Sequence, residues 1–94
     1  MTYRLRVPDA AADLIRSMHP RLRKKVRASL KAILSDPCSG KALKDDLDGL
    51  RSFRVSNFRI IYRVSRNKRL IEIVAVGPRK RIYEETFRAI KKEG

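Results

Sequence analysis

Residues 51–77, RSFRVSNFRIIYRVSRNKRLIEIVAVG, decide the fold of this 94-residue chain. Three strand-like runs within this stretch are separated only by a polar residue at Asn57 and by the segment RNK at 66–68. Alternating or mostly apolar runs of this length are typical of β-strands. Connections this short join antiparallel neighbours, so the sequence predicts a three-stranded antiparallel meander.

The segments before the meander add a strand and two helices. TYRLRV (2–7) alternates, which predicts a short half-buried strand with Tyr3, Leu5 and Val7 on one face. PDAAADLIRSM (8–18) and PRLRKKVRASLKAILSD (20–36) carry apolar residues at helical spacing. The break at His19-Pro20 predicts that these two helices form an antiparallel hairpin.

The segment after the meander, PRKRIYEETFRAIKKE (78–93), predicts a final helix with Pro78 in its first turn. The expected fold class is therefore α+β. An N-terminal strand and a helical hairpin pack on a small antiparallel sheet, a helix closes the chain, and residues 1–94 form a single domain.

The charge of the chain points to a polyanionic partner. Twenty-four Lys and Arg against ten Asp and Glu leave a net charge of +14, which an acidic or phosphate-bearing partner would neutralise. No apolar run approaches the roughly 20 residues of a membrane-spanning helix. The N-terminus MTYRLRV also lacks the apolar stretch of a signal peptide. We therefore expect a cytoplasmic protein with no membrane partner.

The scarcity of cysteine and histidine limits the chemistry. Cys38 and His19 are the only residues of their kinds, and both stand in turn-like segments. This pattern excludes the usual metal sites and catalytic triads, so no metal or cofactor is expected. Any catalysis must use arginine, lysine, tyrosine or carboxylate side chains.

Four arginines recur at regular places in the meander. Arg59 and Arg63 are four residues apart on one strand and therefore share a face, and the turn at Asn57 should bring Arg54 beside Arg59. Arg79 follows at the end of the third strand. Converging guanidiniums near a helix N-terminus favour a bound phosphate, whereas scattered cations that merely keep the chain in solution are the alternative.

Two longer motifs carry a family resemblance. LKDDLDGLRSFRVSNFRIIYRV (43–64) and VAVGPRKRIYEE (74–85) resemble the hairpin and the C-terminal corner of the RelE/ParE superfamily of toxins from toxin–antitoxin pairs. The resemblance covers almost the whole chain. It implies, for the RelE branch, a toxin that enters the ribosome and cleaves mRNA by attack of a ribose 2′-OH on the adjacent phosphate.

The resemblance also implies roles for particular residues. The catalytic residues of the family fall on Arg59, Arg79, Tyr83 and Arg54. Arginine can stabilise the charge of the transition state but is a poor proton carrier, whereas tyrosine has a proton to exchange. A core aromatic in the stripe of the last helix is the structural alternative for Tyr83. The residues expected to bind the RNA backbone are Arg51, Arg63, Lys80 and Arg81.

Two departures from the family pattern leave other functions open. Pro78 stands where many members carry a histidine, and Ser52 stands where a second basic residue is expected. ParE-like relatives share the fold but inhibit DNA gyrase without enzymatic activity, which is the competing function. A nucleic-acid-binding domain without activity is a third possibility. The resemblance implies an acidic cognate antitoxin, through which the pair would bind operator DNA.

The corner motif leads to a geometric expectation. If the last helix begins at Pro78, the spacing of four between Arg79 and Tyr83 puts them on one helix face, one turn apart. They would then converge with Arg59 and Arg54 on one phosphate. Lys80 and Arg81 would point away and contact only the RNA backbone.

Overall fold

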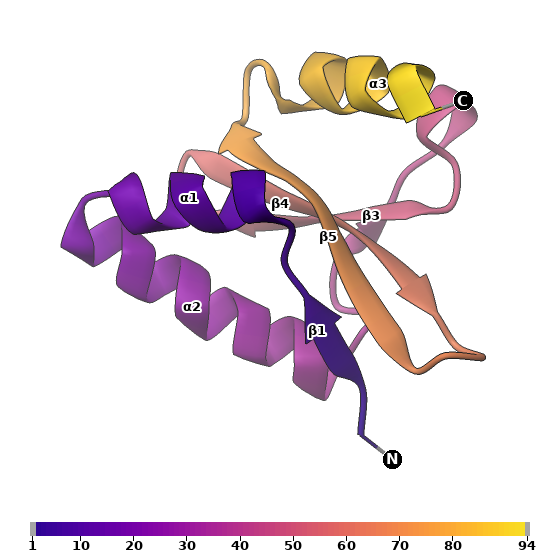
Figure 1. Cartoon of the computed structure of the whole chain (residues 1–94), viewed down its shortest axis with the longest axis horizontal. Helices are drawn as coiled ribbons and strands as arrows, with labels where there is room; N and C mark the ends of the chain where they lie inside the picture. Colours follow the sequence, from indigo (N-terminus) through magenta and orange to yellow (C-terminus); the bar gives the residue numbers. More distant parts are fainter. Residues whose placement is uncertain (1, 94) are drawn as a thin grey trace.

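The computed structural model describes residues 2–93, which form a five-stranded sheet with three α-helices (Figure 1). The strands lie in the order β1-β5-β4-β3-β2. The elements in chain order are β1 (Arg4–Arg6), α1 (Asp9–Ser17), α2 (Pro20–Ser35), β2 (Lys41–Ala42), a 3-10 turn (Asp45–Leu47), β3 (Leu50–Val55), β4 (Phe58–Ser65), β5 (Leu70–Pro78) and α3 (Ile82–Glu93).

The predicted meander is confirmed, because β3, β4 and β5 pair antiparallel in sequence order. Val55 pairs with Phe58, so β3 and β4 are joined by a two-residue turn in which Ser56 has a φ of 55°. A left-handed conformation at this place suits the twist of a tight hairpin. The register of β4 against β5 shifts after Ile61, which leaves Val74 as an extra residue on β5.

The predicted α+β fold class is confirmed, although the N-terminal strand joins the sheet instead of packing on it. β1 is hydrogen-bonded to the edge of the sheet and runs parallel to β5, with Leu5 opposite Ile71, so the sheet is mixed. Alternation identified the face of β1 that is buried, but it contains no information about the partner strand or its direction. The two-residue strand β2 pairs with β3 at the opposite edge.

The predicted helical hairpin is confirmed and covers one face of the sheet (Figure 1). Its apolar stripes pack against the strands. They bury Ile15 of α1, Met18 directly after α1, and Val26 and Ile33 of α2. The backbone N–H of Arg21 donates to Nδ1 of His19, which caps α2. Ala11 of α1 is also buried, whereas Leu14 is 39% exposed.

Tyr62 fastens the loop after α2 to the middle of the sheet. Its side chain is fully buried, its hydroxyl donates to the carbonyl of Pro37 (2.8 Å), and the N–H of Gly40 donates to the hydroxyl (2.9 Å). A Cβ at residue 40 would lie 2.6 Å from that hydroxyl oxygen, so this close approach requires glycine. Burial raises the pKa of Tyr62 above 10.0, and the hydrogen bond with Gly40 partly opposes the rise.

We expect Tyr62→Phe to lower the free energy of unfolding by about 1–3 kcal/mol, because two buried polar groups lose their partner. Urea denaturation measures this loss.

The folded state holds the Tyr62 proton more tightly than the unfolded chain, so this contribution is complete below pH 10.0 and falls as the pH rises further. The variant should therefore lose less stability at alkaline pH than the parent. Equal stability of parent and variant would contradict the role of these hydrogen bonds.

Candidate functional site

The candidate site lies on the face of the sheet that α3 covers. Ser52 and Arg54 lie two residues apart on β3 and therefore share a face. Their cross-strand partners on β4 are Ile61 and Arg59. Cross-strand partners share a face, and Ile61 packs with Ile82 of α3, which identifies that face. The prediction that the hairpin brings Arg54 beside Arg59 is confirmed.

Arg59, Ser52 and Tyr83 form a connected group, here called the Arg59 cluster. Nη1 of Arg59 donates to Oγ of Ser52 at 3.3 Å, and the same oxygen lies 3.3 Å from the hydroxyl of Tyr83. The guanidinium carbon of Arg59 is 5.9 Å from the centre of the Tyr83 ring, which is within the range of a cation–π contact. Three different elements (β3, β4 and α3) therefore supply one polar cluster.

The guanidinium of Arg59 is the least satisfied polar group of this cluster. Its Nε is buried and has no hydrogen-bond partner, and no carboxylate of the described residues lies within 4.0 Å of the guanidinium. A half-buried cation with an unpaired donor favours a bound anion, because arginine can only donate hydrogen bonds. Phosphate oxygens match the geometry of such a group.

Ser52 is the residue whose importance the sequence did not predict. The sequence marks it only as a departure from a basic residue, yet its side chain is 2% exposed and joins Arg59 to Tyr83. Its place on the α3 face could have been inferred from its spacing of two from Arg54. That its hydroxyl would contact two particular side chains could not.

The corner after β5 differs from its prediction. β5 continues to Pro78, which is opposite Phe58, and α3 begins only at Ile82. The N–H of Arg79 donates to the carbonyl of Asn57 at 2.8 Å, which extends the pairing between the corner and the tip of the β3–β4 hairpin. Proline is compatible with the end of a strand, so Pro78 does not start the helix.

The expected helical relation between Arg79 and Tyr83 is therefore wrong, because Arg79 lies in the turn before α3. Arg79, Lys80 and Arg81 instead line one cavity of about 430 Å³ together with Asn57 and Pro78. All three cations are exposed. Lys80 and Arg81 line the same cavity as Arg79, so this cavity groups the three cations of the corner together.

Arg63 shares the face of Arg59 but has carboxylate neighbours. Its partner on β5 is Glu72, and Nη1 of Arg63 lies 3.7 Å from Oε1 of that residue. Arg6 of β1 binds the other oxygen of Glu72 at 3.2 Å. Arg63 is thus partly neutralised, unlike Arg59.

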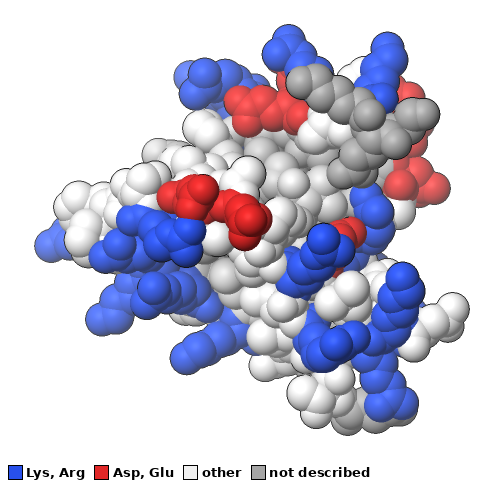
Figure 2. Space-filling model, viewed as in Figure 1, with Lys and Arg blue, Asp and Glu red and all other residues white. Residues whose placement is uncertain are grey.

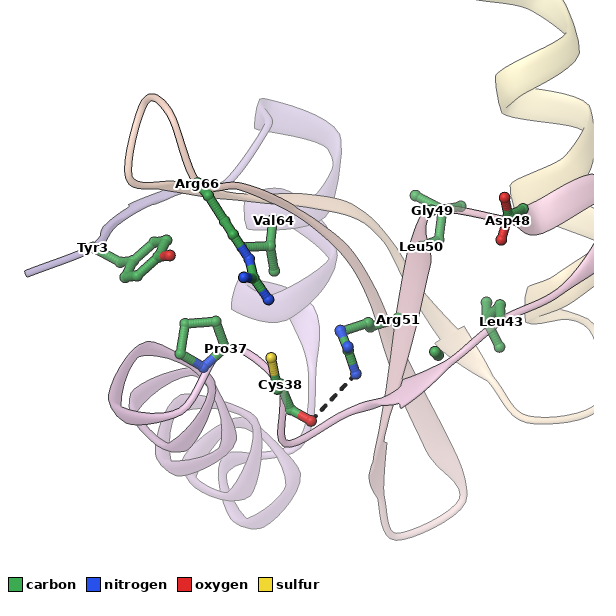
Figure 3. A pocket seen from close by; sticks show the side chains of 11 residues that line it. Tyr3, Pro37, Cys38, Leu43, Asp48, Gly49, Leu50, Arg51, Val64 and Arg66 are labelled. Atoms are coloured by element: carbon green, nitrogen blue, oxygen red, sulfur yellow. Dashed lines mark hydrogen bonds between the residues drawn. The ribbon is translucent and has the colours of Figure 1, made fainter.

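Arg51 lies on the opposite face, because it is three residues from Arg54 on one strand. Its Nη1 donates to the carbonyl oxygens of Gly40 (2.7 Å) and Cys38 (3.3 Å). Figure 3 shows Arg51 at a second cavity, of about 410 Å³, with Cys38, Pro37 and Arg66 around it. Arg51 is therefore not part of the surface that contains Arg59.

Cations dominate the surface around these elements. In Figure 2, Lys and Arg side chains project from many places on the visible face, whereas Asp and Glu form a few small groups.

Among the described residues, no set of three or more His, Cys, Asp or Glu side chains is grouped as a metal site would require. Within the same range, no helix has both the length and the apolar character to cross a membrane.

Comparisons with known proteins give the family. The model of the family described as the ParE toxin of the type II toxin–antitoxin system parDE matches residues 6–83. No curated protein matches the chain in sequence.

Solved structures share the fold. The RelBE2 toxin–antitoxin complex of Mycobacterium tuberculosis contains a chain that is 25% identical, with a TM-score of 0.74 over 84% of this chain and 100% of that chain. A double arginine-to-alanine mutant of Escherichia coli RelE in the free state is 23% identical, with a TM-score of 0.75 over 98% of each chain. A YoeB/ParE toxin from Agrobacterium tumefaciens is 20% identical, with a TM-score of 0.70 over 80% of this chain and 96% of that chain.

The family match extends over most of the chain, and it includes both the β3–β4 hairpin and the corner that carries Arg79 and Tyr83. The α+β fold, with a helical hairpin on one face of the sheet, agrees with the RelE-like structures. This chain belongs to the ParE toxin family of type II toxin–antitoxin systems, within the RelE/ParE superfamily.

Proposed function

We propose that this toxin is a ribosome-dependent mRNA endoribonuclease that inhibits translation. The observation that carries the proposal is the Arg59 cluster, in which a half-buried guanidinium without a carboxylate partner among the described residues lies beside a phenolic hydroxyl. A cation of this kind favours a phosphate, and the hydroxyl can exchange a proton with a group bound to it. The hairpin and corner motifs resemble the RelE branch and favour mRNA on the ribosome, in the cytoplasm, as the substrate.

The reaction consistent with this cluster is internal transfer at one phosphate. The 2′-oxygen of the ribose forms a bond to phosphorus, the bond from phosphorus to the 5′-oxygen breaks, and a cyclic phosphate and a 5′-hydroxyl result. Arg59 would bind the non-bridging oxygens, where negative charge develops. Tyr83 would exchange a proton with one of the two reacting oxygens.

The remaining cations would hold the RNA chain around the reacting phosphate. Arg54 is exposed on the strand next to Arg59, and Arg79 lines the corner cavity with Lys80 and Arg81. We propose that Arg54 and Arg79 add positive charge at the edge of the site. Lys80 and Arg81 would bind backbone phosphates, with a strength that falls as salt rises.

A gyrase inhibitor is the second candidate function. The match to the ParE family model favours it, as does the position of Arg79 outside the helix that carries Tyr83. In this case the cations of the corner would contact an acidic protein surface instead of RNA, and no bond would be broken. Fold similarity does not decide between these functions, since one fold hosts both.

Two assays on the purified toxin distinguish the candidates. We expect the toxin to cleave mRNA on translating ribosomes at discrete positions, and to leave the supercoiling activity of DNA gyrase unchanged at the same concentration. Primer extension on the mRNA and gel electrophoresis of plasmid DNA measure the two outcomes. Gyrase inhibition without mRNA cleavage would establish the second candidate and exclude the first.

We further propose that an acidic cognate antitoxin neutralises this chain. The relatives from Mycobacterium tuberculosis, Pyrococcus horikoshii and E. coli have been solved as complexes of a RelE toxin with its RelB antitoxin. A toxin with a net charge of +14 is complementary to an acidic partner. The antitoxin would cover the helices and the sheet, and the pair would bind operator DNA through it. Failure of every small protein encoded beside this chain to co-purify with it would contradict the proposal.

A further inference from the structure

Gly77 brings a carboxylate next to the Arg59 cluster. Gly77 is buried on β5 directly opposite Arg59. A Cβ on Gly77 would lie 3.4 Å from Oε2 of Glu85 and 3.0 Å from the side chain of Ile82. Because glycine has no side chain, the first turns of α3 lie close to the sheet, and the carboxylate of Glu85 lies over Gly77, the residue opposite Arg59.

The positions of three groups across the sheet follow from the register. Gly77, Arg59 and Arg54 stand opposite one another on β5, β4 and β3, and neighbouring strands are about 4.8 Å apart. Oε2 of Glu85, which lies over Gly77, is therefore on the β5 side of Arg59, and the exposed Arg54 is on the β3 side. The hydroxyl of Tyr83 lies two residue pairs further along these strands, at Ser52.

Glu85 differs from the adjacent glutamate in its contacts. Both residues are exposed, but Glu84 binds Arg88 at 2.6 Å. Glu85 has no ion pair within 4.0 Å among the described residues, so its oxygens remain available as proton acceptors. Glu72, which lies on the same face of the sheet, is held by Arg6 and Arg63.

We propose that Glu85 is the general base of the cleavage reaction, an assignment that rests on the proposed ribonuclease function. The carboxylate takes the proton of the 2′-OH as the 2′-oxygen bonds to phosphorus. As the bond to the 5′-oxygen breaks, Tyr83 gives its proton to that oxygen, and both residues then re-equilibrate with water. Arg59 cannot accept a proton in this reaction, so the site requires a base of another type.

The charged and titratable groups nearest to Glu85 in the fold come from three elements. Arg59 belongs to β4, Arg54 to β3 and Tyr83 to α3 itself. The backbone carbonyl of Arg81, just before the helix, accepts the N–H of Glu85. A base that must be ionised gives the cleavage rate an acidic limb, which falls as the pH falls. The arginines remain protonated over the whole range and contribute no such limb.

The test compares Glu85→Gln with Glu84→Gln, since both variants remove one negative charge from the start of α3. The substrate is ribosome-bound mRNA, and the rate is measured at saturating toxin over a range of pH. We expect Glu85→Gln to lower the rate on the order of 100-fold, the scale of losing a general base, and to remove the acidic limb. Glu84→Gln should keep both the rate and the limb of the parent.

The possible outcomes separate the role of Glu85 from the proposed ribonuclease function. If the parent cleaves mRNA and Glu85→Gln cleaves equally fast with the same pH profile, the assignment of Glu85 is wrong and the ribonuclease function stands. If both glutamine variants lose activity equally, the effect is one of general charge, and the assignment is again wrong. If the parent itself does not cleave, the proposed function fails, and the role of Glu85 fails with it.

Discussion

Replacement of Arg59 by alanine should lower the rate of mRNA cleavage on the order of 1000-fold, which corresponds to about 4 kcal/mol of transition-state stabilisation. Arg59 is the half-buried cation of the site, and its Nε has no partner among the described residues. The substitution removes the group proposed to bind the non-bridging oxygens, together with the partner of Ser52. Single-turnover cleavage of ribosome-bound mRNA measures the loss.

Arg63→Ala is the matched control for this prediction. Arg63 has the same charge, lies on the same strand and shares the face of Arg59, but it is paired with Glu72. We expect this variant to retain the rate at saturation and to differ, if at all, in the salt dependence of binding. Equal losses in both variants would mean that total charge, and not the position of Arg59, determines activity.

The strands of the meander were predictable because their pattern depends on local chemistry. Alternation in the hairpin and the short connection at Asn57 determine which residues pair, so the proximity of Arg54 and Arg59 followed from sequence alone. The helical hairpin was predictable for the same reason, since its apolar spacing and the break at His19-Pro20 are local signals. The parallel pairing of β1 with β5 joins segments more than sixty residues apart, and no local pattern specifies it.

The sequence predicts the start of the last helix wrongly, because proline is compatible both with the first turn of a helix and with the end of a strand. Pro78 can begin a helix, but it can equally end a strand, where its missing N–H costs no hydrogen bond. The backbone of Arg79 bonds to Asn57, and this tertiary contact decides between the two. The face of Arg51, in contrast, could have been inferred, because an odd spacing from Arg54 places it on the other side of the sheet.

The contacts within the site were beyond sequence reasoning for a geometric reason. The hydroxyl of Ser52 is short and reaches only its immediate neighbours, so its link to Tyr83 depends on how closely α3 approaches the sheet. That approach depends in turn on the absence of a side chain at Gly77. The sequence contains both residues, but the distance between a helix and a sheet results from the packing of the whole interface.

Tyr83→Phe should lower the cleavage rate between about 100- and 1000-fold, because it removes the proton that the leaving oxygen requires. The ring remains, so its packing with Leu50, Ile61 and Ile82 is retained, and the melting temperature should change little.

Ser52→Ala provides the control that separates chemistry from positioning. It keeps the phenol but removes the oxygen that contacts both Tyr83 and Arg59. Its loss of rate should be smaller than that of Tyr83→Phe, and Ser52→Thr, which restores a hydroxyl, should recover part of it. If Tyr83→Phe folds normally and cleaves as fast as the parent, then Tyr83 is a core aromatic and the proton of the leaving group comes from elsewhere. Because the phenol and the serine hydroxyl share one hydrogen bond, a rate loss in Ser52→Ala that exceeds the loss in Tyr83→Phe would instead assign the proton transfer to Ser52.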